Sequence, residues 1–83
     1  MYHYVYILKT VDGYIKKTYV GYSTNVIARL KKHNSSKGAK ATKGFKWKVI
    51  YKKRFLLKSK ALSFEYKLKK DRKKRLSILK EIK

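Results

Sequence analysis

The chain has 83 residues, of which 43% are hydrophobic, so it can bury one modest core, and we expect a single domain over residues 1–83. Cysteine is absent, which excludes disulfide frameworks, cysteine-ligated zinc sites and thiol nucleophiles. No apolar run reaches the roughly 18 residues that a membrane span needs, and the N-terminus lacks the layout of a signal peptide, so we expect a soluble, intracellular protein with no membrane partner.

The net charge is the strongest compositional signal in the chain. Against 25 Lys and Arg residues stand 4 Asp and Glu residues, which gives a formal net charge of +21. We expect a polyanionic partner, and nucleic acid is the commonest one, because each neutralised phosphate releases condensed counterions whatever the base sequence. A Lys-rich composition explains part of the excess, and an anionic membrane surface is the weaker alternative because no segment has the apolar stripe of a surface-bound helix.

The first part of the chain predicts a β-hairpin. Residues 2–9 are rich in aromatic and β-branched side chains, which is typical of a strand. Asp12 and Gly13 form a turn signal, since Gly accepts positive φ and Asp can hydrogen-bond its own backbone. Residues 14–20 then make the returning strand, which ends at Gly21.

A helix is expected after the hairpin. Ser23 or Thr24 can cap it, and apolar side chains recur at helical spacing over residues 26–33. Polar side chains spaced four apart form a stripe on a different face of this helix: Asn25, Arg29 and His33. Residues 34–44 are small, polar and basic, which predicts a loop whose backbone can approach a ligand closely.

The last part of the chain predicts one strand and two helices. Trp47, Val49 and Tyr51 alternate as in a strand. Ser59 precedes a helix over residues 60–70. Asp71 can cap a last helix over residues 72–83, which has enough apolar side chains to dock on the body. The order is therefore ββαβαα, an α+β fold in which helices flank a three-stranded antiparallel sheet.

The few acidic residues allow a metal site to be located by elimination. Asp12 belongs to the expected turn, Asp71 to a helix start, and Glu81 to a terminus that is expected to fray. Glu65 is left, in mid-helix beside apolar neighbours. Its alternative role is an ion pair with Lys69 one turn later, and the spacing alone does not separate the two roles. A single carboxylate can hold magnesium, which keeps most of its waters and takes further ligands from substrate phosphates.

Other candidate site residues are Arg29, His33, Tyr6 and Tyr19. Arg29 is the only Arg in the first 53 residues, and a guanidinium grips two phosphate oxygens as a planar fork, with codon chance as the alternative. His33 can shuttle a proton or bind phosphate, although a lone His on a helix is more often a surface residue. Tyr6 and Tyr19 fall on strands that are expected to pair. A phenol near Arg29 and a metal can lose its proton and then accept one from an attacking water.

The chain resembles the GIY-YIG nuclease family over roughly residues 2–70. The residues that carry the resemblance stand in the family order: Tyr4-Val5-Tyr6 as the first signature triplet, Tyr19-Val20-Gly21 as the second, then Arg29, His33 and Glu65. Further matching positions are Thr24-Asn25, His33-Asn34, Gly38-Ala39, Thr42, Trp47, Ala61-Leu62 and Phe64. Within the family the chain is most similar to the small stand-alone members and to the catalytic domain of structure-specific, branched-DNA endonucleases. Tyr4 replaces the Gly of the first triplet, and the Asn that many relatives carry after the Glu has no counterpart.

The resemblance implies a GIY-YIG nuclease-like fold and in-line hydrolysis of a phosphodiester. It implies Tyr6 or Tyr19 as general base, with His33 orienting the phosphate or relaying protons. Arg29 would lie on the scissile phosphate, and Glu65 would hold magnesium, for which manganese can substitute. We therefore expect a magnesium-dependent DNA endonuclease that acts on duplex or branched DNA, with branched or flap structures in repair or recombination as one substrate class.

Contacts to nucleic acid are expected outside the reacting centre as well. The expected contact residues are Asn25, Lys37, Lys40, Thr42 and Lys43. Phosphate contacts of this kind fix the register of a nucleic acid without reading its sequence. Two alternatives remain open: a basic nucleic-acid-binding protein without catalysis, and a nuclease directed at RNA. Both alternatives would have the same charge and the same loop.

Overall fold

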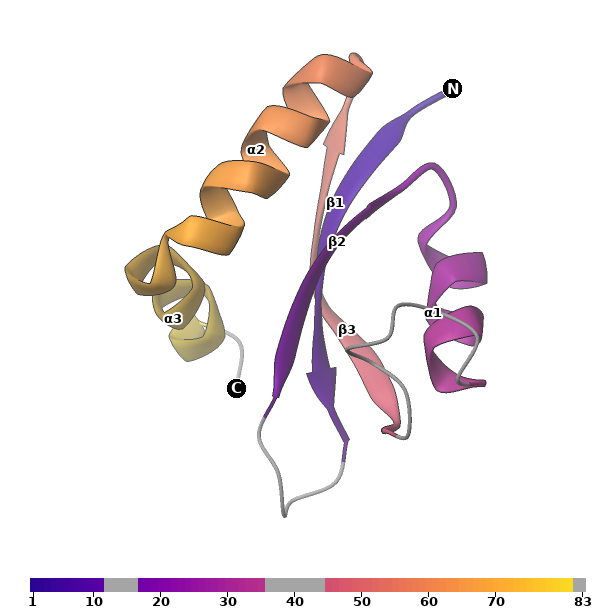
Figure 1. Ribbon diagram of the computed structural model, residues 1–83, viewed down its shortest axis with the longest axis vertical. Helices are drawn as coiled ribbons and strands as arrows, with labels where there is room; N and C mark the ends of the chain where they lie inside the picture. The colour runs from indigo at the N-terminus through magenta and orange to yellow at the C-terminus, as the bar shows by residue number, and fades with distance from the viewer. Residues whose placement is uncertain (12–16, 36–44, 82–83) are drawn as a thin grey trace.

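The computed structural model describes residues 1–11, 17–35 and 45–81. Its elements follow in the order β1 (His3–Thr10), β2 (Thr18–Ser23), α1 (Val26–Asn34), β3 (Trp47–Phe55), α2 (Lys58–Lys70) and α3 (Arg72–Glu81) (Figure 1). This order confirms the predicted ββαβαα arrangement and the α+β class. The expected turn at Asp12 and Gly13 and most of the expected loop, residues 36–44, lie outside the described residues.

The sheet has three antiparallel strands in the order β2-β1-β3. Strand β1 is central, and its four middle residues have no exposed surface: Val5, Tyr6, Ile7 and Leu8. A strand that is buried on both faces is apolar at successive positions, not only at alternate ones. This explains why the predicted first strand is a continuous aromatic and aliphatic run.

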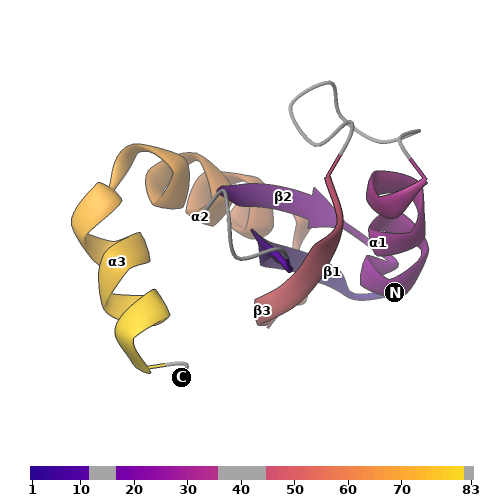
Figure 2. The ribbon, with the colours of Figure 1, turned by 90° about the horizontal axis from the view of Figure 1, so that it is seen from below.

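Helices cover both faces of the sheet, with α1 on one side and α2 and α3 on the other (Figures 1 and 2). Successive side chains of a strand point to opposite faces, so β1 contributes to both layers. Val5 and Ile7 pack with Ala61 and Leu68 of α2. Tyr6 and Leu8 belong to a second cluster with Val26 of α1 and Trp47 of β3.

The predicted cap of the first helix is wrong. The residue that caps α1 is Asn25, whose side-chain Oδ1 accepts a hydrogen bond from the Ala28 N–H at 3.1 Å. The Ser23 hydroxyl instead accepts from the Asn25 N–H at 2.9 Å and donates to the Asn25 carbonyl at 3.0 Å. Ser23 therefore fixes the cap residue rather than acting as the cap, and Thr24 lies between the two.

The starts of the last two helices differ in how well the sequence predicts them. Helix α2 begins at Lys58, after Leu57, which makes no side-chain capping bond, so the expected start after Ser59 is wrong. Asp71 does cap α3, since its Oδ1 accepts from the Lys74 N–H at 3.0 Å. Within the described part of the chain, no helix is both long enough and apolar enough to cross a membrane.

Candidate active site

Three aromatic rings and a guanidinium meet on the side of the sheet that α1 covers. The Tyr6 hydroxyl lies 3.1 Å from Nε2 of His33, and neither side chain has exposed surface. The ring of Tyr19, which is half-buried, lies 5.0 Å from the His33 ring between centroids. Tyr6 and Tyr19 are thus brought together by the β1–β2 pairing, as predicted, and His33 is a buried residue and not a surface one.

Gly21 makes room for Tyr6. The two residues face each other across β1 and β2. A Cβ atom added at Gly21 would lie 2.5 Å from both Cζ and the hydroxyl oxygen of Tyr6, which is closer than side chains pack. The glycine that ends the second triplet is therefore required by the Tyr6 ring that lies over it.

Arg29 lies one turn before His33 on α1, and its side chain is half-buried. Its guanidinium lies near the Tyr6 phenol, whose ionised form it favours by hydrogen bonding and charge. Its Nε is buried and has no hydrogen-bond partner among the described residues. A buried donor without an acceptor costs about 1–3 kcal/mol, so this atom marks a place where an acceptor from a ligand would be stabilising.

The surroundings shift the pKa values of Tyr6 and His33 in opposite directions. Burial raises the pKa of the Tyr6 phenol above 10.0, although hydrogen bonding and the charge of Arg29 act against the rise, and the neighbouring Tyr19 and Glu65 add to it. Burial, and then the charge of Arg29, lowers the pKa of His33 below 6.5. At neutral pH the phenol is therefore protonated and the imidazole is neutral.

Glu65 lies in the opposite layer, on the helix that covers the other face of the sheet. It lies on α2, only 17% of its side chain is exposed, and its charge acts on Tyr6. Its Oε2 also lies 3.5 Å from Nζ of Lys69, so the ion pair that was the alternative interpretation is present. The described residues contain no group of three or more His, Cys, Asp or Glu side chains that could hold a metal. A metal at Glu65 would thus have few ligands from the described residues, which fits magnesium completed by water and phosphate oxygens.

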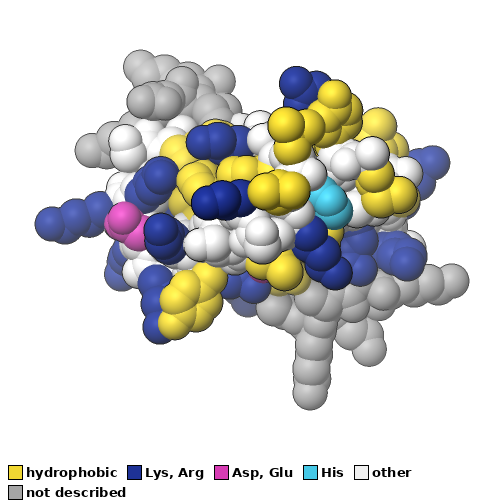
Figure 3. Space-filling view, turned by 90° about the horizontal axis from the view of Figure 1, so that it is seen from above, with side chains coloured by type: hydrophobic (Ala, Val, Ile, Leu, Met, Phe, Trp, Pro, Cys, Tyr) yellow, Lys and Arg dark blue, Asp and Glu magenta, His cyan; other side chains and the backbone are white. Residues whose placement is uncertain are grey.

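The expected nucleic-acid contacts are only partly within the described residues. Asn25 is exposed at the start of α1, four residues before Arg29. The other four expected contact residues lie outside the described ranges: Lys37, Lys40, Thr42 and Lys43. Basic side chains are spread over the face that Figure 3 shows, with hydrophobic ones between them.

Asn34 is a functional position that the sequence reasoning missed. Its side chain accepts a hydrogen bond from the Trp47 N–H at 2.6 Å and donates to the Trp47 carbonyl at 3.1 Å. These two bonds hold the end of α1 to the start of β3 and so fix the residue next to His33. The signal was available, since Asn34 and Trp47 are both among the positions that match the family.

Comparison with known proteins identifies the family. The model of the GIY-YIG catalytic domain matches residues 2–77. The chain belongs to the GIY-YIG family. The five candidate residues Tyr6, Tyr19, Arg29, His33 and Glu65 lie within the matched range, and membership of this family suggests a nuclease that acts on nucleic acid.

The similar proteins are short bacterial members of the family. A UPF0213 protein of Staphylococcus haemolyticus is 43% identical, with 95% of each chain covered. A UPF0213 protein of Oceanobacillus iheyensis is 44% identical over 81% of this chain and 76% of the relative. The solution NMR structure of a UPF0213 protein from Bacillus halodurans has 40% identity and a TM-score of 0.54, covering 96% of this chain and 84% of that one. The GIY-YIG fold expected from the sequence is therefore confirmed.

Proposed function

We propose that this protein is a magnesium-dependent endonuclease that hydrolyses phosphodiester bonds of DNA. The observation that carries the proposal is the buried arrangement around Tyr6, in which its hydroxyl lies 3.1 Å from Nε2 of His33 while the nearby Arg29 keeps a buried, unpaired Nε. Buried polar atoms of a structural core are nearly always hydrogen-bonded, so the unpaired donor indicates a ligand site.

Arg29 would bind the scissile phosphate. Its guanidinium lies near the Tyr6 phenol, and its buried Nε needs an acceptor. A phosphate oxygen supplies that acceptor with a full negative charge, which makes the hydrogen bond about twice as strong as a neutral one. The positive charge of the guanidinium would then stabilise the negative charge that develops on the phosphate during attack.

Tyr6 is the better placed of the two phenols for general base, with Tyr19 as the alternative. Its oxygen lies 3.1 Å from Nε2 of His33, and Arg29 favours the ionised form of the phenol. When the phenol accepts a proton from the attacking water, it can release its own proton to Nε2 of His33, so no phenolate needs to persist. The Tyr6 side chain is fully buried, so the attacking water would enter together with the phosphate, past the half-buried ring of Tyr19.

Glu65 would hold the metal. Bound magnesium, or manganese in its place, supplies positive charge to the reacting phosphate and its leaving oxygen. For Glu65 to serve, its carboxylate must leave Lys69, whose side chain is half exposed. An exposed pair of this kind contributes roughly 0–1 kcal/mol, so giving it up costs little.

The substrate would lie on the basic surface near α1, with Asn25 and the cations of the following loop on its phosphates. Branched or flap DNA is the proposed substrate class within DNA repair or recombination. The test is incubation with plasmid, flap, junction and RNA substrates, each with magnesium and with a chelator. We expect magnesium-dependent cleavage of DNA. Tight binding without cleavage of any substrate would identify a non-catalytic nucleic-acid-binding protein, and cleavage of RNA alone would identify an RNA nuclease.

A further inference from the structure

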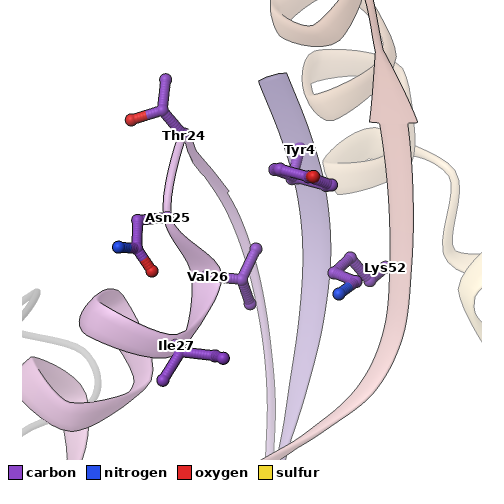
Figure 4. Close-up of a pocket in the computed structure, with 6 residues that line it drawn as sticks. All are labelled: Tyr4, Thr24, Asn25, Val26, Ile27 and Lys52. Atoms are coloured by element: carbon purple, nitrogen blue, oxygen red, sulfur yellow. The ribbon is translucent and has the colours of Figure 1, made fainter. Parts of the chain in front are cut away.

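A small pocket lies between the start of α1 and the sheet (Figure 4). Its volume is about 170 Å³, and it is lined by Tyr4, Thr24, Asn25, Val26, Ile27 and Lys52. In Figure 4, Val26 and Ile27 extend from α1 toward the sheet, and Lys52 extends from β3 toward them beside Tyr4. Of these residues only Asn25 belongs to the nuclease site proposed above.

The lining of the pocket is mixed. Tyr4, Val26 and Ile27 form its apolar and aromatic part, and Thr24, Asn25 and Lys52 its polar part. Ile27 is 71% exposed, and the Tyr4 ring is half-buried. The Lys52 ammonium lies over this ring, with Nζ 5.4 Å from its centroid. An exposed aliphatic side chain and an aromatic ring beside an ammonium, in a protein of charge +21, suit a ligand that is flat and apolar in one part and anionic in another.

The pocket is next to the proposed active site. Tyr4 and Tyr6 are two residues apart on β1 and so point to the same face of the sheet. Lys52 lies directly opposite Tyr6 in the β1–β3 pairing. Asn25, which lines the pocket, caps the same helix that carries Arg29. A nucleic acid strand whose phosphate lies at Arg29 can therefore pass over the start of α1 and reach the pocket with a neighbouring nucleotide.

We propose that this pocket binds the nucleobase of a nucleotide that flanks the cut, with the base against the Tyr4 ring and Ile27. Lys52 then moves from the ring to that nucleotide's phosphate. This inference rests on the proposed nuclease function, because it takes the bound polyanion to be a nucleic acid. Aromatic side chains bind bases by stacking whatever the base, and a base can enter such a pocket only when it is not paired in a duplex.

Photocrosslinking tests the contact directly. An oligonucleotide with 5-iodouracil at successive positions is bound in the presence of a chelator and irradiated, and the crosslinked residue is found by peptide fragmentation. We expect a crosslink at Tyr4 from one position or two neighbouring ones. The crosslink should persist in Tyr4→Phe, which keeps the ring, and be lost in Tyr4→Leu. Crosslinks confined to other aromatic residues, such as the exposed Tyr2 and Tyr66, would overturn the proposal. The crosslinking yields at Tyr4 are compared for DNA and RNA oligonucleotides of the same sequence, and the higher yield shows which polymer supplies the base.

A matched pair of variants covers the case in which Tyr4→Leu fails to fold. Ile27→Glu and Leu56→Glu make the same charge change at side chains of similar exposure, 71% and 75%, and only Ile27 lines the pocket. Both variants are compared with the parent in their affinity for the oligonucleotide. Because Ile27→Glu also loses the base contact, its affinity should fall roughly 5-fold to 100-fold further than that of Leu56→Glu. Equal losses of affinity would show that only the net charge matters, and would overturn the proposal that the pocket binds a base.

Cleavage measured on the same preparations separates the two claims. A Tyr4 crosslink without cleavage would support base binding in the pocket and refute the nuclease activity. Cleavage without a Tyr4 crosslink would support the nuclease activity and refute base binding in the pocket.

Discussion

The two faces of the sheet carry different kinds of core. Under α2 the buried side chains are aliphatic: Val5, Ile7, Val20, Ala61 and Leu68. Under α1 the buried groups include the Tyr6 phenol, the His33 imidazole and the unpaired Nε of Arg29. Successive side chains of β1 point to opposite faces. Val5 and Ile7 therefore pack in the aliphatic core under α2, whereas Tyr6 between them belongs to the polar cluster under α1. Changes on the two faces should therefore have separable effects.

The largest effect is expected on the α1 face, for Arg29→Lys. Lysine keeps the charge but loses the planar fork, so binding should remain while the cleavage rate falls about 100-fold or more, as when a transition-state donor is removed. Arg54→Lys is the matched control, because Arg54 is exposed and lies over Tyr2. Single-turnover cleavage and binding of both variants are measured. Equal rates for the two would mean that Arg29 is one more surface cation.

On the α2 face, Leu68→Ala should affect stability and not chemistry. Leu68 is 1% exposed, and truncating a buried Leu typically lowers the free energy of unfolding by about 2–5 kcal/mol. Urea unfolding gives the loss, and cleavage is compared per folded molecule, where we expect no change. If Leu68→Ala unfolds the domain, Ile7→Val removes one methylene from the same cluster for about 0.5–1.5 kcal/mol. A cleavage rate that falls in step with stability would contradict the division between the faces.

A smaller effect on the α1 face is a pH dependence of stability from His33. Its pKa is lowered in the folded protein relative to 6.5, so the unfolded chain binds a proton that the folded one does not. The resulting stabilisation is present above pH 6.5 and is lost as the pH falls from there through the folded pKa. Urea unfolding at several pH values should show this loss in the parent, and His33→Gln should flatten it. Identical slopes for the two proteins would show that another group is responsible.

The fold and the cluster are predictable from the sequence because their signals are local or repeated. Turn residues, strand runs and helical spacing give ββαβαα, and strand pairing follows from the short hairpin. The four-residue spacing of Arg29 and His33 predicts that they lie one turn apart on the same side of a helix, and in the structure both lie on α1. The sequence does not decide which side of this helix faces the core. For that reason a surface position was the commoner expectation for His33, whereas in the structure its side chain is buried.

Details that depend on tertiary contacts are not predictable in this way. Ser23, Thr24 and Asn25 are all favourable cap residues, and only the hydrogen bonds of Ser23 to the Asn25 backbone decide among them. The fit of Gly21 under Tyr6 requires the strand register. The pocket at Lys52 requires the β1–β3 pairing, which shifts by a residue between Ile7 and Leu8.

Glu65 on α2 is proposed to hold the metal for the site on the α1 face, and not only to form an ion pair with Lys69. Glu65→Gln keeps the volume and the helix but removes the charge, and Lys69→Gln removes the same ion pair while leaving the carboxylate. Both variants should lose at most about 1 kcal/mol of stability, because the pair is partly exposed. Cleavage of DNA is measured over a magnesium titration. We predict that Glu65→Gln binds DNA at least as tightly as the parent and does not cut at any magnesium concentration, whereas Lys69→Gln still cuts. Magnesium-dependent cleavage by Glu65→Gln at the rate of Lys69→Gln would contradict the account.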